Sequence, residues 1–326
     1  LYQYYTKFLI LSMMFRMKKI LFTIGLWVYA QVLLAQSSES PFLMVLGVAQ
    51  DGGYPQAGCE KACCAPVWVN PQLGRYVSCL GLVEPASARR WMFDATPDFR
   101  AQLRWLQQQP PALATKPLDG IFVTHGHIGH YSGLMNLGRE VMGAQHVKVY
   151  AMPQMQGFVR QYGPWNQLLK LSNIDLQALA ADSVIQLSSQ LRVIPFKVPH
   201  RAEYTETVGF RIEGPRRKVV FIPDIDKWEL WERRIETVIE SADVVLLDAT
   251  FYADGEIPGR PMKDIPHPFI EETMQRLAKL PANERNKVYF IHLNHTNPAL
   301  VIGSEAQQAI ERKGFHVAQQ GQRIEL

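Results

Sequence analysis

Three histidines fall within six residues at the end of an apolar segment. Residues 118–124 read Leu-Asp-Gly-Ile-Phe-Val-Thr, which is typical of a buried strand, and His125, His127 and His130 follow directly. A neutral imidazole binds zinc, iron or manganese through one ring nitrogen while a neighbouring acceptor orients the other nitrogen. A lone histidine is more often an ordinary buried or surface residue. Three at this spacing after a strand predict a metal site.

Further donor side chains come closely after other apolar segments. Short runs of β-branched and aromatic residues are followed by a histidine or an aspartate at four positions, namely His200, Asp224, His292 and His295. His267 differs, because it stands between two prolines at the expected start of a helix. Ligands carried by strand ends meet at one edge of a sheet, which is a rigid support for a metal site.

The elements that must position these residues alternate along the chain. Apolar runs rich in β-branched residues predict strands, among them Leu43–Val48, Gly120–Val123, Leu191–Val198 and Val288–Leu293. Helical spacing predicts helices over Asp98–Gln109, Ser132–Met142, Met155–Leu171, Lys227–Glu240, Pro268–Leu280 and Gly303–Lys313. Clusters of strands with helices between them predict an α/β (α+β) arrangement of two sheets with helices on their outer faces. No fixed-period repeat interrupts this order, so residues 36–326 are predicted to form one domain.

The first 35 residues differ in composition from the rest. They carry four basic residues and no acidic one, so the 30 acidic residues of the chain are balanced by the basic residues after position 35. Met17-Lys-Lys, the apolar run 20–34 and Leu-Leu-Ala at 33–35 predict a secretory signal peptide that starts at Met17. The run is shorter than the ~20 residues that span a bilayer, so no membrane span is expected after the signal is removed. We predict a periplasmic or secreted chain that lacks the broad positive charge that attracts nucleic acid.

The strand-end ligands resemble those of the metallo-β-lactamase superfamily. Its pattern is His-x-His-x-x-His, a later single histidine, a strand-end aspartate and a final histidine. The resemblance implies a four-layer αββα sandwich and one or two divalent ions, with zinc favoured over manganese or iron. In this superfamily the first ion is held at positions matching His125, His127 and His200, the second at His130 and His292, and Asp224 bridges them. Asp94 would orient the histidine loop without binding an ion.

Three longer segments resemble one branch of this superfamily, the pyrroloquinoline quinone synthesis protein B (PqqB) family. They start at Val45, Asp94 and Ile291 and read VLGVAQDGGYPQ, DATPDFRAQL and IHLNHTNP. The first two histidines of the metal motif resemble instead the hydrolases of the superfamily, such as tRNase Z and cyclic phosphodiesterases. The chain therefore resembles PqqB in these three segments and the hydrolases in the ligands expected for the first ion.

One ligand of the superfamily pattern is missing. An aspartate usually stands directly before the third histidine and binds the second ion, but this chain has Gly129 there. We expect the second site to be weak, lost or completed by another group such as His295 or His267. These two histidines are also our candidates for catalytic groups. The segment Asp248-Ala-Thr-Phe with His267 resembles tRNase Z-like enzymes and implies proton transfer to the leaving group, whereas the alternative is a surface histidine at a helix start.

Three cysteines lie close together after a glycine-rich turn. Cys59, Cys63 and Cys64 fall within six residues, where PqqB-like and phosphodiesterase relatives place cysteines for a structural zinc. An oxidising compartment would instead favour a disulfide, and the spacing is not the usual Cys-x2-Cys. We predict a structural zinc site. Cys79 is expected to be a buried core thiol within a strand.

These patterns together predict a metal-dependent hydrolase. Metal-bound hydroxide would cleave an ester or phosphodiester-type bond of a small molecule. One alternative is a PqqB-type role in the synthesis or transport of pyrroloquinoline quinone, with redox chemistry at iron, and another is a non-catalytic metal or ligand binder. No nucleic-acid partner is expected, and a homodimer is left open. Metal identity separates hydrolysis from redox chemistry, because redox chemistry needs iron or copper.

Overall fold

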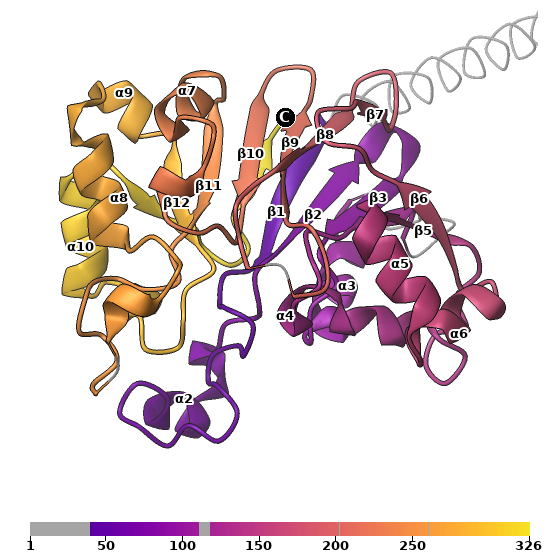
Figure 1. The fold of residues 1–326 in the computed structure, drawn as a ribbon, viewed down its shortest axis with the longest axis horizontal. Coiled ribbons are helices and arrows are strands. Elements are labelled where there is room, and N and C mark those ends of the chain that lie inside the picture. Colours follow the sequence, from indigo (N-terminus) through magenta and orange to yellow (C-terminus); the bar gives the residue numbers. More distant parts are fainter. Residues whose placement is uncertain (1–39, 111–117, 202, 260) are drawn as a thin grey trace, which may run out of the picture. The chain divides into compact units, whose positions relative to one another are not determined.

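Two seven-stranded sheets of mixed strand direction form the centre of the compact unit Pro41–Leu326 (Figure 1). The computed structural model describes residues 40–110, 118–201, 203–259 and 261–326. In spatial order the first sheet consists of β14 (Arg323–Glu325), β1 (Phe42–Gly47), β2 (Cys79–Glu84), β3 (Arg89–Phe93), β4 (Gly120–Phe122), β5 (Val147–Ala151) and β6 (Ile174–Ala178). The second consists of β13 (His316–Val317), β12 (Val288–Ile291), β11 (Val244–Asp248), β10 (Lys218–Ile222), β9 (Val208–Glu213), β8 (Arg192–Lys197) and β7 (Ile185–Gln186).

Burial on both faces of the sheets explains the long apolar runs in the sequence. All residues of β1 are buried, and successive side chains of a strand point to opposite faces. Leu43 belongs to the core between the sheets, whereas Phe42 belongs to the core beneath the helices. Aromatic contacts join the two sheets, because the ring of Phe210 lies 5.3 Å from that of Phe93 and 5.6 Å from that of Phe122.

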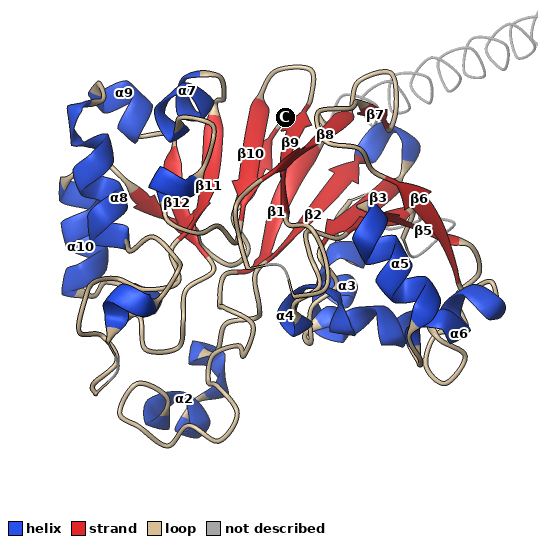
Figure 2. Cartoon of the chain, in the orientation of Figure 1, coloured by secondary structure: helices blue, strands red, loops and turns tan. Residues whose placement is uncertain are grey.

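Helices cover the outer face of each sheet (Figure 2). The first sheet is covered by α3 (Phe99–Gln107), α5 (Pro153–Gln161) and α6 (Trp165–Lys170), and the second by α7 (Ile235–Glu240), α8 (Ile270–Arg276) and α10 (Glu305–Arg312), with α9 (Ala282–Arg285) beside them. Two short helices, α2 (Ala65–Val69) and α4 (Ile128–Tyr131), lie in loops. The 3-10 helices are Pro71–Leu73, Pro85–Ser87, Ser132–Leu137, Trp228–Leu230, Met262–Asp264, Leu277–Lys279 and Pro298–Leu300. This order of layers confirms the predicted αββα sandwich.

Three predicted helices take a different form. The segment Lys227–Glu240 contains a 3-10 helix (Trp228–Leu230) and α7 rather than one helix, because Trp231 and Arg234 between them have an extended backbone. The segment Met155–Leu171 contains α5 and α6 rather than one helix, because Tyr162 is extended and Pro164 has no backbone N–H with which to continue the first helix. Residues 132–142 form a 3-10 helix only as far as Leu137, where Gly138 ends it with an extended backbone. The helical spacing of apolar residues therefore predicted where these helices lie but not the residues at which they are interrupted.

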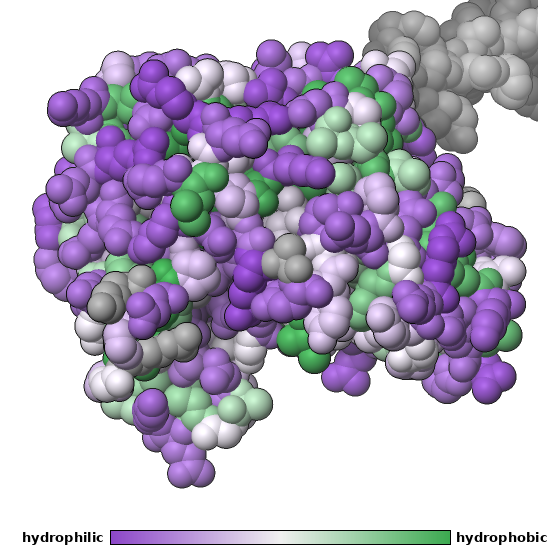
Figure 3. Space-filling model, viewed as in Figure 1, coloured by the Kyte–Doolittle hydropathy of each residue, from purple (hydrophilic) through white to green (hydrophobic). Residues whose placement is uncertain are grey.

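The predicted signal peptide and the residues before it lie outside the described residues, so export remains a prediction. Within the described part of the chain, no helix has both the length and the apolar character needed to cross a membrane. The face drawn in Figure 3 is largely hydrophilic with small hydrophobic patches. Most apolar side chains of the strands are buried instead.

Candidate metal centre

Six predicted ligands meet beside the ends of strands that belong to both sheets. They follow β4, β8, β10 and β12, and they are His125, His127, His130, His200, Asp224 and His292. Asp51, which follows β1, joins them and was not among the predicted ligands. The ends of neighbouring strands lie together, which is why ligands far apart in sequence reach one place.

The first group of ligands consists of three histidines. His127 Nδ1 lies 2.8 Å from His125 Nε2 and 3.3 Å from His200 Nε2. Asp224 Oδ2 is 3.5 Å from His125 Nε2, and its other oxygen is 3.9 Å from His200 Nε2. Three imidazole nitrogens beside one carboxylate form a donor set that suits zinc, manganese or iron.

The second group consists of two histidines and two carboxylates. His130 Nε2 lies 2.8 Å from Asp224 Oδ2 and 3.0 Å from Asp51 Oδ1. His292 Nε2 lies 3.3 Å and 3.5 Å from the same two oxygens. Asp224 therefore faces both groups, as a bridging ligand between two ions would.

The unpaired polar atoms of the second group fit a bound cation. Asp51 Oδ1, His130 Nε2 and His292 Nε2 are buried and lie close to one another, but within the described part of the chain none of these contacts has the geometry of a hydrogen bond. Leaving a buried polar atom unsatisfied costs about 1–3 kcal/mol. Because the three atoms converge on one place and are all metal ligands by type, a divalent ion would satisfy them together.

The opposite nitrogen of each histidine is held by a neighbouring side chain. His130 Nδ1 is 2.7 Å from Asp94 Oδ2, and His200 Nδ1 is 2.9 Å from Asp226 Oδ1. The remaining three partners are Thr124 Oγ1 for His125, Glu203 Oε2 for His127 and Thr250 Oγ1 for His292. Such bonds fix both the ring orientation and the nitrogen left free for an ion.

Two residues of the centre have a left-handed backbone. Asp94 has φ of 70° and His292 has φ of 65°, a region that non-glycine residues rarely adopt. Asp94 also accepts hydrogen bonds from the backbone N–H and the hydroxyl of Thr124. Strained backbone is typical of functional sites, where the surrounding structure holds it in place.

The electrostatic surroundings of Asp224 and His125 favour the forms of these two side chains that bind a cation. Burial raises the pKa of Asp224, but the imidazoles of His292 and His130 outweigh this effect and hold the pKa well below its usual value. Burial, together with nearby His130, holds the pKa of His125 well below its usual value. An ionised carboxylate and a neutral imidazole are the forms that bind metal ions.

His267 lies beside the centre. Its Nδ1 is 2.7 Å from Asp248 Oδ2 and 3.5 Å from Asp224 Oδ1. Burial lowers the pKa of His267, but Asp248 and Asp224 raise it, to about 9. His267 is therefore an imidazole held by Asp248 that forms a further potential ligand group with His200 and Asp224, and it does not complete the second group.

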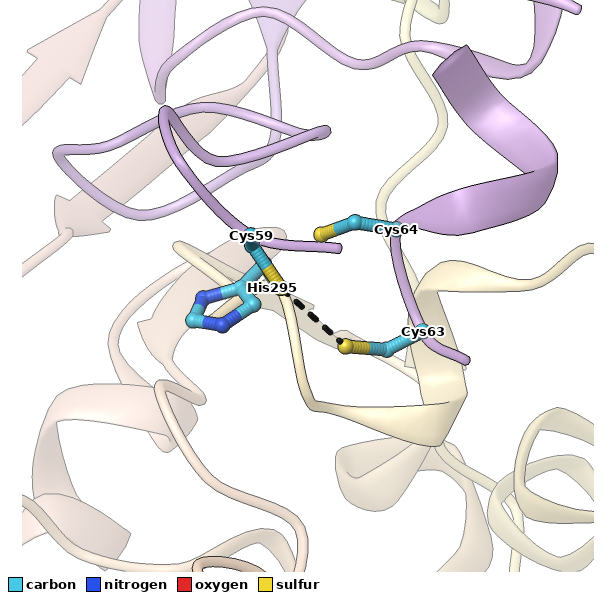
Figure 4. A group of neighbouring side chains, drawn as sticks. All are labelled: Cys59, Cys63, Cys64 and His295. Atoms are coloured by element: carbon cyan, nitrogen blue, oxygen red, sulfur yellow. Dashed lines mark hydrogen bonds between the residues drawn. The ribbon is translucent and has the colours of Figure 1, made fainter. Parts of the chain in front are cut away.

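The cysteines form a separate cluster with His295 (Figure 4). Sγ atoms of Cys59 and Cys63 are 3.8 Å apart, and the donor atoms of the four residues all lie within 4.8 Å of one another. All of these cysteines are free thiols, and burial raises the pKa of Cys64 to about 12. Three sulfurs and one imidazole match a tetrahedral zinc site. The strand-end ligands His125, His127, His130, His200, Asp224 and His292, together with Asp51, are called the rim below. His295 was expected among them. It lies with the cysteines instead, because the chain after His292 pairs with the loop after β1.

Comparison with known proteins agrees with this arrangement. Residues 89–293 match the family model described as beta-lactamase superfamily domain. The chain belongs to the beta-lactamase superfamily. Within it, the chain is 29% identical over 312 residues to coenzyme PQQ synthesis protein B of Methylobacterium nodulans, which covers 87% of this chain and 99% of that protein. The corresponding protein of Xanthomonas euvesicatoria is 26% identical over 310 residues, with the same coverage of both chains.

Solved structures of superfamily members share the fold. Zinc-bound PqqB from Methylobacterium extorquens superposes with a TM-score of 0.73 at 23% identity, covering 87% of this chain and all of that one. A diphosphatase of the PhnP family gives 0.60 at 21% identity, covering 88% and 97% of the two chains. The short form of human tRNase Z gives 0.54 at 17% identity, covering 87% and 98%. The chain is thus a PqqB-like member of the superfamily, with side chains grouped as they would be to hold divalent ions.

Sequence reasoning missed Asp51 and the partners that orient the histidines. Asp51 carried a usable signal, because it follows an apolar strand just as Asp224 does and precedes two glycines. Glu203 and Asp226 had no such signal in the sequence, since neither belongs to a recognised metal-binding motif. Their roles depend on where the loops after β8 and β10 fold.

Proposed function

We propose that the chain is a metal-dependent hydrolase acting on an ester or phosphodiester-type bond of a small molecule. The observation that carries the proposal is the pair of ligand groups facing Asp224 from two sides. Two adjacent ions that share a carboxylate are typical of enzymes that displace a leaving group with water. Membership of a superfamily rich in hydrolases supports the proposal.

The chain's own residues would hold the reacting groups. When bound, a divalent ion lowers the pKa of water towards ~7 and polarises a substrate oxygen. The histidines and carboxylates fix the place where this occurs, and Asp94 and Asp226 keep their ligand histidines from turning. The buried strand ends exclude solvent from one side of that place.

His267 is our candidate for proton transfer to the leaving group. Its Nδ1 bonds to Asp248, which leaves Nε2 to carry the proton. Replacing His267 by Gln should lower kcat by about 10²–10⁴-fold with little change in bound metal, because general acid catalysis contributes about that much. Steady-state kinetics and elemental analysis of the same preparation measure both quantities, with His316→Gln as a surface control. Equal kcat in His267→Gln and the parent would contradict the role, and loss of an ion would make His267 a ligand instead.

The hydrolase proposal is tested by a substrate screen with a matched pair of variants. The purified chain is loaded with zinc, manganese or iron and assayed with p-nitrophenyl acetate and bis(p-nitrophenyl) phosphate. Turnover that is lost in Asp224→Asn and kept in Asp175→Asn supports the proposal, since Asp175 pairs with exposed His146 outside the centre. Turnover equal in both variants would point to a contaminant and overturn it.

A second candidate function is favoured by the full-length similarity to coenzyme PQQ synthesis protein B. That function would be a step in making or carrying a quinone cofactor, with redox chemistry at iron. Metal content separates the two candidates, because hydrolysis proceeds with zinc or manganese and redox chemistry needs iron or copper. Elemental analysis of the chain as purified, beside His125→Ala, distinguishes the rim ions from any ion at the cysteines.

A further inference from the structure

The carboxylate of Asp51 occupies the space where a side chain of residue 129 would begin. A Cβ atom added to Gly129 would lie 2.2 Å from Asp51 Oδ1 and 2.6 Å from its Cγ. It would also lie 2.7 Å from the Cα of Asp51, so moving the carboxylate alone could not relieve the clash. The absence of a side chain at position 129 is therefore what admits Asp51.

We propose that Asp51 is the carboxylate ligand of the second ion, moved from position 129 in the histidine loop to the loop after β1. The superfamily pattern has an aspartate before the third histidine, and this chain has Gly129 there. Asp51 Oδ1 faces the two ligand nitrogens that Asp224 Oδ2 also faces, 3.0 Å from His130 Nε2 and 3.5 Å from His292 Nε2. The two changes compensate each other, and the second site keeps its full donor set.

The backbone around Asp51 is positioned independently of any ion. Gln50 donates its N–H to the carbonyl of Leu293 at 2.8 Å, and Leu293 donates to Val48 at the same distance. Gly53, with φ of 70°, donates to the carbonyl of Gln50 and closes a tight turn. Asp51 is thus joined to the segment that carries His292, which explains how a loop residue keeps a ligand's position.

The inference concerns ion binding alone and does not require the proposed hydrolysis. Asp51→Asn keeps the volume of the side chain but removes its charge, and we expect about one ion fewer per chain. Gly129→Ala changes no ligand atom, yet the clash with Asp51 should cause the same loss. Gly157→Ala in helix α5 is the control, since a Cβ there meets nothing within 4 Å.

Elemental analysis and competition between Zn²⁺ and a chromophoric chelator measure the number and affinity of bound ions in the full chain. Far-UV circular dichroism reports folding of each variant. Loss of one ion in Asp51→Asn and Gly129→Ala, with Gly157→Ala unchanged, supports the inference. Parent-like zinc binding in either of the first two variants overturns it.

A matched pair at position 51 keeps the test decisive if Gly129→Ala folds poorly. Asp51→Asn removes the charge of the carboxylate, and Asp51→Glu keeps a carboxylate on a longer side chain. We expect Asp51→Glu to bind zinc more tightly than Asp51→Asn, because a charged ligand is retained. Equal or weaker binding in Asp51→Glu would overturn the inference.

Discussion

The two candidate metal centres draw ligands from the same two loops but are held in different ways. The loop after β1 provides Asp51 to the rim and Cys59 to the cluster, while the segment after β12 provides His292 and His295. At the rim, each ligand histidine is fixed through its second nitrogen by a separate side chain. In the cluster, the thiols contact mainly one another.

The two centres also differ in how deeply their surroundings are buried. Rim ligands such as His130 and His292 are fully buried between well-packed strands. The cluster lies beside the five-residue helix α2, where Trp68 and Val69 are exposed and only Val67 of that helix is buried. We therefore expect the rim to keep its structure without an ion, and the cysteine segment, whose helix buries only Val67, to depend on an ion for its structure.

The largest effect is expected from the residue that both rim groups share. Asp224→Asn removes a buried charge facing His125, His130 and His292, so the rim should lose about two ions while the cysteine cluster keeps its ion. Elemental analysis of Asp224→Asn beside Asp175→Asn gives the count. An unchanged count would mean that Asp224 bridges nothing.

A different loss is expected from the cysteine cluster. Cys63→Ser should remove about one ion, leave the rim ions in place and expose residues 54–73 to protease, because the ion replaces a missing core. Trypsin cleavage after exposed Lys61 reports the opening. Cys79→Ser is the matched control, since Cys79 is buried in β2 away from the cluster.

Thiol titration distinguishes a zinc site from a disulfide at the cysteine cluster. After denaturation with a chelator and without reductant, a zinc cluster leaves about four reactive thiols, whereas a disulfide leaves about two. The lower number would remove the zinc assignment for the cluster and leave the rim unaffected. His295 would then have no ligand role.

The smallest of these effects is expected from a residue that orients a ligand without binding the ion. Asp94→Asn keeps a side chain that tolerates positive φ but weakens the bond to His130 Nδ1, so zinc affinity at the second site should fall about 10–100-fold. Chelator competition measures the affinity. Wild-type affinity in Asp94→Asn would mean that the rim does not depend on such partners, and the contrast with the cysteine cluster would fail.

The local sequence determined the layers of the fold and most ligands. Strands buried on both faces leave continuous apolar runs, and ligands placed directly after such runs must emerge at strand ends, so His125 and Asp224 could be found by inspection. The break between α5 and α6 could also have been read from Gly163-Pro164, although helical spacing alone concealed it.

Tertiary structure alone decided which donors share an ion. His295 stands three residues after His292 and resembles it in sequence context, yet the two contribute to different centres because the chain turns between them towards the loop after β1. Likewise, Gly129 signals only a missing ligand, and nothing local indicates that Asp51 fills its place. Spacing describes ligands on one segment, whereas contact between two loops distant in sequence arises only when the sheets pack.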